Sequence, residues 1–317
     1  MLDSLWISCD DSGVVGAGAM SLKEVLDAQY EAFNVEDSAT DPVQFVHRTP
    51  ADPADRELVG FIAAGLAFGR VASVMASVGR VVEVMGAHPA RYVRDFDPRR
   101  DARALTPIVH RWIRGADLVA LMLVLQAMLR EHGSIEGAFV AGHDPAAADV
   151  GPALDAFAVR ACAVDVRPAY GRAVPDRAGY RYFFARPSGG SACKRLNLFL
   201  RWMVRRDAVD PGCWTRVSPS QLVVPLDTHI IRLGRCLGLT RQTTPGWKMA
   251  AEITAALRRL DPADPIRYDF ALCHLGMMKA CRFGLARTHP GCPLAGWCKP
   301  ARSEAKSGAA GRGSRTP

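Results

Sequence analysis

The stretch DRELVGFIAAGLAFGRVASVMASVGRVVEVMGAHP, residues 55–89, sets the fold class of this chain. Its apolar residues recur every three or four positions, which is the period of an amphipathic α-helix, and the small residues between them allow close packing. The Pro-Ala-Asp run before it offers capping groups, and Gly86 with Pro89 supplies a stop. The stretch therefore predicts two helices of an all-α protein.

The same period recurs along most of the chain, and no alternating pattern of strand character competes with it. Further helices are predicted over residues 21–33, 116–131, 152–164, 191–205, 228–237, 247–260 and 265–280. We therefore expect an all-α architecture of about ten helices joined by short loops.

The two ends of the chain differ from this pattern. The helical period begins only after Met20, so we expect residues 1–19 to be a disordered extension, and both Met1 and Met20 remain candidates for the start of translation. Residues 299–317, KPARSEAKSGAAGRGSRTP, are basic, polar and rich in small residues. This composition predicts a disordered basic tail.

The composition is ordinary for a soluble globular protein, with 49% hydrophobic and 23% charged residues. No window of about 20 apolar residues lacks charge, so we expect no membrane span. The N-terminus has no basic segment before its weak apolar stretch, which argues against a secretory signal. Nine cysteines, an odd number in a chain without such a signal, favour a reducing compartment. We expect a cytoplasmic protein.

The formal net charge is +8, which suits a polyanionic partner such as nucleic acid. Of the 40 basic residues, 34 are Arg and six are Lys, a bias that a GC-rich genome would also produce. The charge permits a nucleic-acid partner and does not prove one.

A long irregular segment, residues 166–190, combines five Arg, three Pro, four Gly and five aromatic residues. Arg side chains pair with phosphates and exposed rings stack on bases, so one interpretation is a nucleic-acid surface. The equal alternative is a loop that packs its aromatic residues onto the core. The sequence leaves both open.

The helix predicted after this segment begins SACKRLNLF, with Ser191 as its expected cap and Lys194 in its first turn. The free N–H groups of a first turn bind anions. A cation there opposes the helix dipole, so the position favours a Lys that reacts as an amine over one that is purely structural. The alternative is a solvated surface Lys194.

The segment VVPLDTHIIRLGRCLGL, residues 223–239, joins an apolar run to a helix. Asp227 or Thr228 is the expected N-cap of that helix, and an N-cap side chain can also point into a cleft. His229 is expected to pack or to face a phosphate rather than to act as a general base.

Lys194 followed by the segment D-T-H-I-I-R from Asp227 resembles the helix-hairpin-helix DNA glycosylases typified by endonuclease III. In these a lysine at a helix start precedes V-D-T-H-hydrophobic-x-R, whose aspartate is the catalytic carboxylate. The resemblance covers about residues 191–298. More closely, the blocks DRELVGFIAAGLAFGR, KRLNLFLRWMVR, PLDTHIIRLGRCLGL and DPIRYDFALCHLG look like the bacterial family called domain of unknown function 2400.

The resemblance implies a glycosylase-like helical domain over residues 20–298, with two lobes and a cleft between them. It implies that Asp227 stabilises an oxocarbenium-like sugar and that Lys194 attacks C1′ to form a Schiff base, which adds AP-lyase activity. The implied partner is duplex DNA with a damaged or mispaired base, and this base must be flipped out of the stack before it reacts. The protein is expected to act as a monomer associated with the nucleoid. The alternative is a non-catalytic nucleic-acid-binding protein that retains the fold.

The resemblance also implies a set of DNA-binding residues: Gly189, Gly190, Ser191, Arg195, His229 and Arg232. Two features depart from endonuclease III. Its hairpin L-P-G-V-G is replaced by SGGSAC, and Lys194 and Asp227 are 33 positions apart, about twice the separation there. The chain must therefore grip DNA differently.

The C-terminal segment CRFGLARTHPGCPLAGWC, residues 281–298, has the spacing C-x7-H-x2-C-x5-C. Endonuclease III-type proteins ligate a [4Fe–4S] cluster with C-x6-C-x2-C-x5-C. The resemblance thus implies a cluster held by Cys281, His289, Cys292 and Cys298. Three Cys and one His also suit structural zinc, and a loop without metal is the third alternative.

Several other residues are expected to be structural. Phe199, Trp202 and Cys273 are assigned to helix cores, and three acids near the first helical block are assigned as caps: Asp52, Asp55 and Glu57. Four arginines are expected to form either a solvated face or a phosphate track: Arg195, Arg201, Arg205 and Arg206.

Overall fold

The computed structural model describes residues 20–35, 41–171, 173–277 and 292–297. These residues form helices joined by loops and contain no β-strand. Ten of their α-helices have eight residues or more, which confirms the all-α prediction of about ten helices. The extension and the basic tail assigned to residues 1–19 and 299–317 lie outside the described residues.

The helices run in the following order. The α-helices are α1 Leu22–Phe33, α2 Gln44–Arg48, α3 Pro53–Gly65, α4 Val71–Met85, α5 Pro89–Arg94, α6 Pro98–Leu105, α7 Gly115–His132, α8 Ile135–Val140, α9 Gly151–Ala163, α10 Arg167–Tyr170, α11 Lys194–Val204, α12 Thr228–Cys236, α13 Trp247–Arg258 and α14 Asp269–Met277. The 3-10 helices are η1 Gly179–Phe184, η2 Pro187–Gly189, η3 Pro219–Gln221 and η4 Ala295–Trp297.

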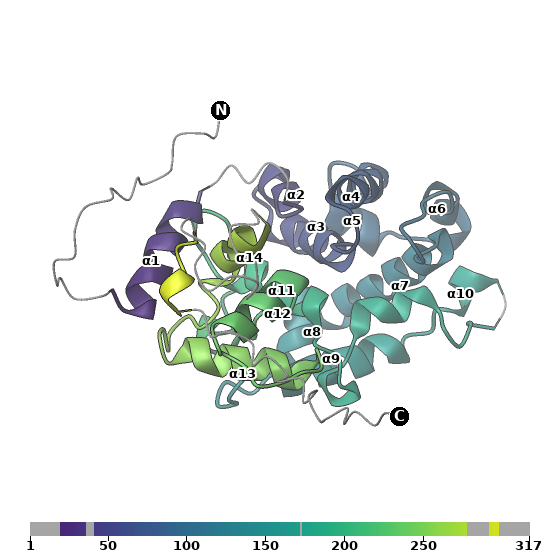
Figure 1. Cartoon of the computed structure of the whole chain (residues 1–317). Helices are drawn as coiled ribbons and strands as arrows, with labels where there is room; N and C mark the ends of the chain where they lie inside the picture. The colour runs from purple at the N-terminus through teal and green to yellow at the C-terminus, as the bar shows by residue number, and fades with distance from the viewer. Residues whose placement is uncertain (1–19, 36–40, 172, 278–291, 298–317) are drawn as a thin grey trace, which may run out of the picture.

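Helices far apart in the sequence pack together. Helix α3 packs on α11, and α1 packs on α14, so helices from the N-terminal part of the described chain contact helices from its C-terminal part (Figure 1). Helices α4 to α7 lie on the other side, with α10 at the far edge (Figure 1). No helix within the described ranges is both long and apolar enough to cross a membrane. The division into two lobes stays a prediction.

Helix α3 is almost wholly buried, and its acidic residues organise its neighbours. Asp52 caps α3 itself, accepting a hydrogen bond from the backbone N–H of Ala54 at 2.9 Å. Asp55 instead accepts from the N–H of Ala90 at the start of α5. Its carboxylate therefore satisfies a free donor of another helix, which the local sequence does not reveal.

Glu57 has the same role at the start of α8. Its carboxylate accepts the N–H groups of Ile135 at 2.8 Å and Glu136 at 2.6 Å, and also the indole N–H of Trp214 at 2.8 Å. The prediction that Asp55 and Glu57 act as caps is thus correct in kind, but the helices that they cap are α5 and α8.

The irregular segment 166–190 mostly packs its aromatic residues onto the core, which is the second of the two predicted alternatives. Tyr180 and Phe183 are buried, and Asp117 of α7 accepts the backbone N–H of Gly179 at 2.7 Å. A Cβ at Gly179 would lie 2.5 Å from the Asp117 carboxylate, so the contact requires glycine. Tyr182 remains exposed, with 49% of its surface accessible. The segment thus packs most of its aromatic rings onto the core and exposes the ring of Tyr182 to solvent.

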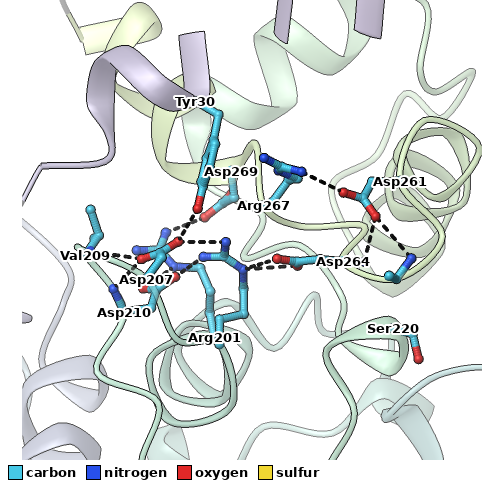
Figure 2. Close-up of polar contacts among 12 residues, drawn as sticks. Tyr30, Arg201, Asp207, Val209, Asp210, Ser220, Asp261, Asp264, Arg267 and Asp269 are labelled. Atoms are coloured by element: carbon cyan, nitrogen blue, oxygen red, sulfur yellow. Dashed lines mark hydrogen bonds and ion pairs between the residues drawn. The ribbon is translucent and has the colours of Figure 1, made fainter. Parts of the chain in front are cut away.

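Arg201 of α11 and Arg205, the C-cap residue of this helix, are buried rather than solvated or arranged along a phosphate track. Arg201 is 3% exposed, and it donates to Asp210 at 3.1 Å and to Asp269 of α14 at 2.6 Å (Figure 2). Arg205 is 4% exposed and also donates to Asp210. The expectation for these two residues was wrong because carboxylates distant in the sequence pair with them. Phe199 and Trp202, by contrast, are core residues as predicted.

The same network extends to the loops around α11. Arg205 donates to Asp207 at 2.8 Å and to Asp264 at 2.8 Å, and the hydroxyl of Tyr30 donates to Asp207 at 3.1 Å (Figure 2). The network, which we call the α11 ion network, comprises Arg201, Arg205, Asp207, Asp210, Asp264 and Asp269. It joins α11, the turn after α11, the loop before α14 and α14, and Tyr30 of α1 donates to it.

Removing one charge from this network is expected to destabilise the fold. In Asp210→Asn, two buried guanidinium groups lose a shared carboxylate, and we expect the free energy of unfolding to fall by about 3–5 kcal/mol. Urea unfolding followed by circular dichroism measures this loss.

The matched control is Asp95→Asn. Asp95 pairs with Arg91 on the surface, with exposed fractions of 64% and 80%, so its loss should cost less than about 1 kcal/mol. Equal losses in the two variants would contradict a structural role for the buried network.

Candidate functional site

Helix α11 begins after an unusual turn. Gly190 has φ of +79° and Cys193 has φ of +49°, so both lie in the left-handed region that favours glycine. Cys193 is the N-cap residue, and its side chain makes no capping hydrogen bond. Ser191 is therefore not the N-cap, contrary to expectation, and its hydroxyl accepts the N–H of Cys193 at 3.1 Å instead. The first-turn N–H groups of α11 have no side-chain cap.

The two glycines before α11, Gly189 and Gly190, are both exposed. The carbonyl of Gly190 accepts the N–H of Trp247 at 3.4 Å, at the start of α13. A Cβ at Gly246 would lie 2.8 Å from that carbonyl oxygen, so the turn packs tightly on α13. Gly189 and Gly190 both have open space where a Cβ would be, so both predicted DNA-binding glycines face open solvent.

Lys194 lines a pocket of about 160 Å³ between the first turn of α11 and η1. Ser191, Tyr182 and Phe183 are among the other lining residues. Lys194 is half-buried and makes no hydrogen bond or ion pair with any residue that the structure describes. An amine and the uncapped N–H groups of a helix start therefore border one pocket, which is suited to an anionic, electrophilic ligand.

Arg195, predicted to contact DNA, is engaged within the protein. Its guanidinium donates to the carbonyl of Tyr182 and lies over the rings of Phe68 at 5.2 Å and Tyr182 at 5.3 Å. Burial lowers the pKa of Arg195 to about 10. The side chain thus holds η1 and the loop before α4 against α11.

Asp227 is the N-cap of α12 and is one of the two predicted N-cap residues, Asp227 and Thr228. One carboxylate oxygen accepts the N–H groups of His229 at 2.8 Å and Ile230 at 2.7 Å. The other oxygen accepts the thiol of Cys273 on α14 at 3.1 Å. Burial, reinforced by the charge of Asp227, raises the pKa of the Cys273 thiol, so it stays protonated as a donor. The carboxylate is half-buried and has internal partners on both oxygens.

The two other predicted residues of α12 differ in exposure. His229 packs against α14, where a Cβ at Gly276 would lie 2.7 Å from its ring nitrogen Nδ1. That nitrogen is buried and has no hydrogen-bond partner among the described residues. This agrees with the expectation that His229 packs. Arg232 lies on the exposed surface of α12.

The structure relates Lys194 to Asp227 through α14. Arg201 follows Lys194 by seven residues, which is about two turns and 10 Å along the same face of α11. Arg201 pairs with Asp269, and one turn later on α14 Cys273 bonds to Asp227. No hydrogen bond or ion pair within the described chain joins Lys194 to Asp227, and the latter does not line the Lys194 pocket. The acid and the amine lie at the starts of two linked helices without direct contact.

Sequence reasoning missed Asp269 as a partner of this site. Burial raises the pKa of Asp269 to about 6, with Arg201 opposing the shift and the charge of Asp227 reinforcing it. One oxygen of Asp269 is buried without a partner among the described residues. The available signal was the acid and the cysteine one turn apart on a single predicted helix, at positions 269 and 273.

Of the four predicted metal ligands, only Cys292 lies within the described residues, where it is half-buried against the core. Cys281, His289 and Cys298 lie outside them. The described residues contain no group of three or more potential ligands. The predicted metal site therefore stays a prediction.

Fold and site together define an all-α protein in which a lysine starts one helix and an aspartate caps another. The chain belongs to the family described as Protein of unknown function (DUF2400), whose model matches residues 41–278. This range includes α2 to α14, Lys194 and Asp227. No curated protein and no solved structure matches the chain.

Substitutions at Asp227 are expected to separate its cap role from its charge. Asp227→Ala removes the acceptor of two N–H groups and should lower the free energy of unfolding by about 1 kcal/mol. Asp227→Asn keeps an oxygen acceptor and should stay within about 0.5 kcal/mol of the parent. Urea unfolding compares them, with Thr228→Ala as the control. A larger loss for Thr228→Ala than for Asp227→Ala would reject Asp227 as the cap.

Proposed function

We propose that this protein is a base-excision DNA glycosylase with AP-lyase activity. The observation that carries the proposal is the pocket at the uncapped start of α11, which Lys194 borders without an internal partner. A strand phosphate suits the free N–H groups, and the amine is a nucleophile for the sugar carbon next to that phosphate. The net charge of +8 supports a polyanionic substrate.

The chemistry assigned to Lys194 is a nucleophilic substitution at C1′ of the damaged nucleotide. The Nζ lone pair forms a bond to C1′, the bond from C1′ to the base breaks, and the base leaves with the electron pair and takes up a proton. Loss of a proton from Nζ and opening of the sugar ring give a Schiff base, from which elimination of the 3′ phosphate cleaves the strand.

Asp227 is assigned the stabilisation of positive charge on the sugar. Its position is fixed by the two N–H groups of α12 and by the Cys273 thiol. A carboxylate held in this way need not reorganise when charge develops nearby, which is the condition for electrostatic catalysis. Asp227→Asn, whose fold is expected to survive, should lower the rate of base release by at least about 100-fold.

The decisive experiment is borohydride trapping on a panel of lesion-bearing duplexes. Borohydride reduces the Schiff base to a stable amine, so the parent protein should give a covalent protein–DNA adduct that Lys194→Gln does not form. The matched control is Lys248→Gln, because Lys248 is an exposed lysine in the first turn of α13. Equal trapping by Lys194→Gln and the parent would reject Lys194 as the nucleophile.

A second candidate function is nucleic-acid binding without catalysis. It is favoured by the position of Asp227, whose two oxygens have internal partners and which does not line the Lys194 pocket. This alternative predicts binding that weakens with salt, is the same for damaged and undamaged DNA, and never yields an adduct.

The metal site is proposed separately from the reaction. Cys281, His289, Cys292 and Cys298 would hold a [4Fe–4S] cluster, with zinc or no metal as alternatives. Cys292, the member of this set that lies within the described residues, packs half-buried against the core. The metal would brace the C-terminal segment against the helices.

Metal analysis of anaerobically purified protein tests this proposal. We expect about four irons per chain and a brown colour, both lost in Cys298→Ser. The control is Cys162→Ser, at an exposed cysteine of α9. Zinc in place of iron would reject the cluster, and neither metal would reject the site.

A further inference from the structure

Three exposed or half-exposed rings form a surface beside the Lys194 pocket. Phe68 and Trp112 are stacked, with ring centroids 4.7 Å apart and an angle of 28° between the planes. Trp112 and Tyr182 follow at 5.1 Å and 50°. Trp112 is 42% exposed and Tyr182 is 49% exposed, which is unusual for large rings in a soluble protein. We call Phe68, Trp112 and Tyr182 the ring surface.

Arginines lie against these rings on both sides. The guanidinium of Arg111 lies 5.2 Å from the centroid of Trp112, and that of Arg195 lies over both Phe68 and Tyr182. Arg111 has φ of +54°, a strained conformation for a residue other than glycine. This strained backbone conformation places Arg111 and Trp112 side by side on the surface.

The support beneath the ring surface is rigid. Buried His110 bonds through Nε2 to the carbonyl of Phe68 at 2.9 Å and through Nδ1 to the hydroxyl of Ser77 at 3.0 Å. Because the carbonyl only accepts, Nε2 carries the proton and Nδ1 accepts from Ser77. Burial lowers the pKa of His110, which keeps this neutral arrangement. Backbone hydrogen bonds between His110 and Ile113 close the turn that carries Trp112.

The charged residues of the segments that build the ring surface are all cations, while Asp117 and Asp155 of neighbouring helices contact these segments through hydrogen bonds. The ring surface is built from three segments of the chain, residues 66–70, 106–114 and 179–195. Together these hold seven cations and no acid: Arg70, Arg111, Arg114, Arg181, Arg186, Lys194 and Arg195. Five of them are exposed: Arg70, Arg111, Arg114, Arg181 and Arg186. An apolar protein partner would not require seven cations, whereas a phosphodiester strand complements both the rings and the charge.

We propose that the ring surface binds unpaired nucleobases of a DNA strand, with Trp112 and Tyr182 as stacking partners and Arg111 on the flanking phosphate. Base faces are accessible to such rings only where the strand is unpaired. Tyr182 and Arg195 also line the Lys194 pocket, so the bound strand runs directly past Lys194. This inference rests on the proposed function, because that function identifies the bound strand as the DNA substrate. It adds the surface that would keep the bases of this strand unpaired.

Fluorescence anisotropy of a labelled oligothymidylate with the full-length protein tests the proposal. Stacking on aromatic side chains contributes about 1–3 kcal/mol per base, so Trp112→Ala and Tyr182→Ala should each weaken binding by about 5- to 150-fold. The matched control is Trp297→Ala, because Trp297 is 39% exposed and lies in η4, outside the ring surface. Equal affinities of Trp112→Ala and Trp297→Ala would overturn the proposal.

The arginine is tested by salt dependence. Arg111→Asn removes the cation, and asparagine tolerates the left-handed backbone at this position. The slope of log affinity against log salt should fall in magnitude by about 0.7, the value for one phosphate contact on a single strand. The control Arg99→Asn, at an exposed position of α6, should keep the parent slope. A slope unchanged in Arg111→Asn would contradict the phosphate contact.

Circular dichroism melting of each variant excludes loss of the fold as the cause of weaker binding. If no lesion yields an adduct while Trp112→Ala still weakens strand binding, the glycosylase proposal fails and the ring surface stands. If adducts form and Trp112→Ala binds like the parent, the ring surface fails alone. Tighter binding of a fully paired duplex than of oligothymidylate would also overturn it.

Discussion

The α11 ion network is the constraint on which the rest of the structure depends. Arg201 and Arg205 are 3% and 4% exposed, and a buried charge is tolerated only when it is paired. Their carboxylate partners come from the turn after α11, from the start of α14 and from the loop before α14. Helix α11 therefore cannot shift along its axis without leaving charges unpaired. The helix that carries Lys194 is fixed in position by groups two to three turns away.

The network also connects the two candidate residues. Asp269 of α14 ends the network on one side, and Cys273 of the same helix donates to Asp227. The position of the Asp227 carboxylate therefore depends on the same helix that pairs with Arg201. Lys194 and Asp227 do not contact each other, but the positions of both depend on contacts with α14. Precise placement of separate groups on packed helices is what an active site between helices requires.

The sequence predicts the helices well because their periodicity is local. The expected ranges for α7, α9, α12 and α13 differ from the observed helices by two residues or fewer at each end. It could not predict which buried charges pair, because Arg201 meets Asp269 across 68 positions. The expected Ser191 cap fails for a related reason: Cys193 adopts a left-handed conformation that its residue type does not favour. Long-range pairing and backbone strain leave little local signal.

Backbone strain concentrates next to Lys194 and the ring surface. Cys193 and Arg111 are the residues other than glycine with positive φ in the described chain. One strained residue precedes Lys194, and the other precedes Trp112. Strain at two such points requires compensation from elsewhere, which buried hydrogen bonds and ion pairs supply. Folding alone gains nothing from strained backbone beside exposed rings, whereas the proposed binding of an anionic strand would gain from it.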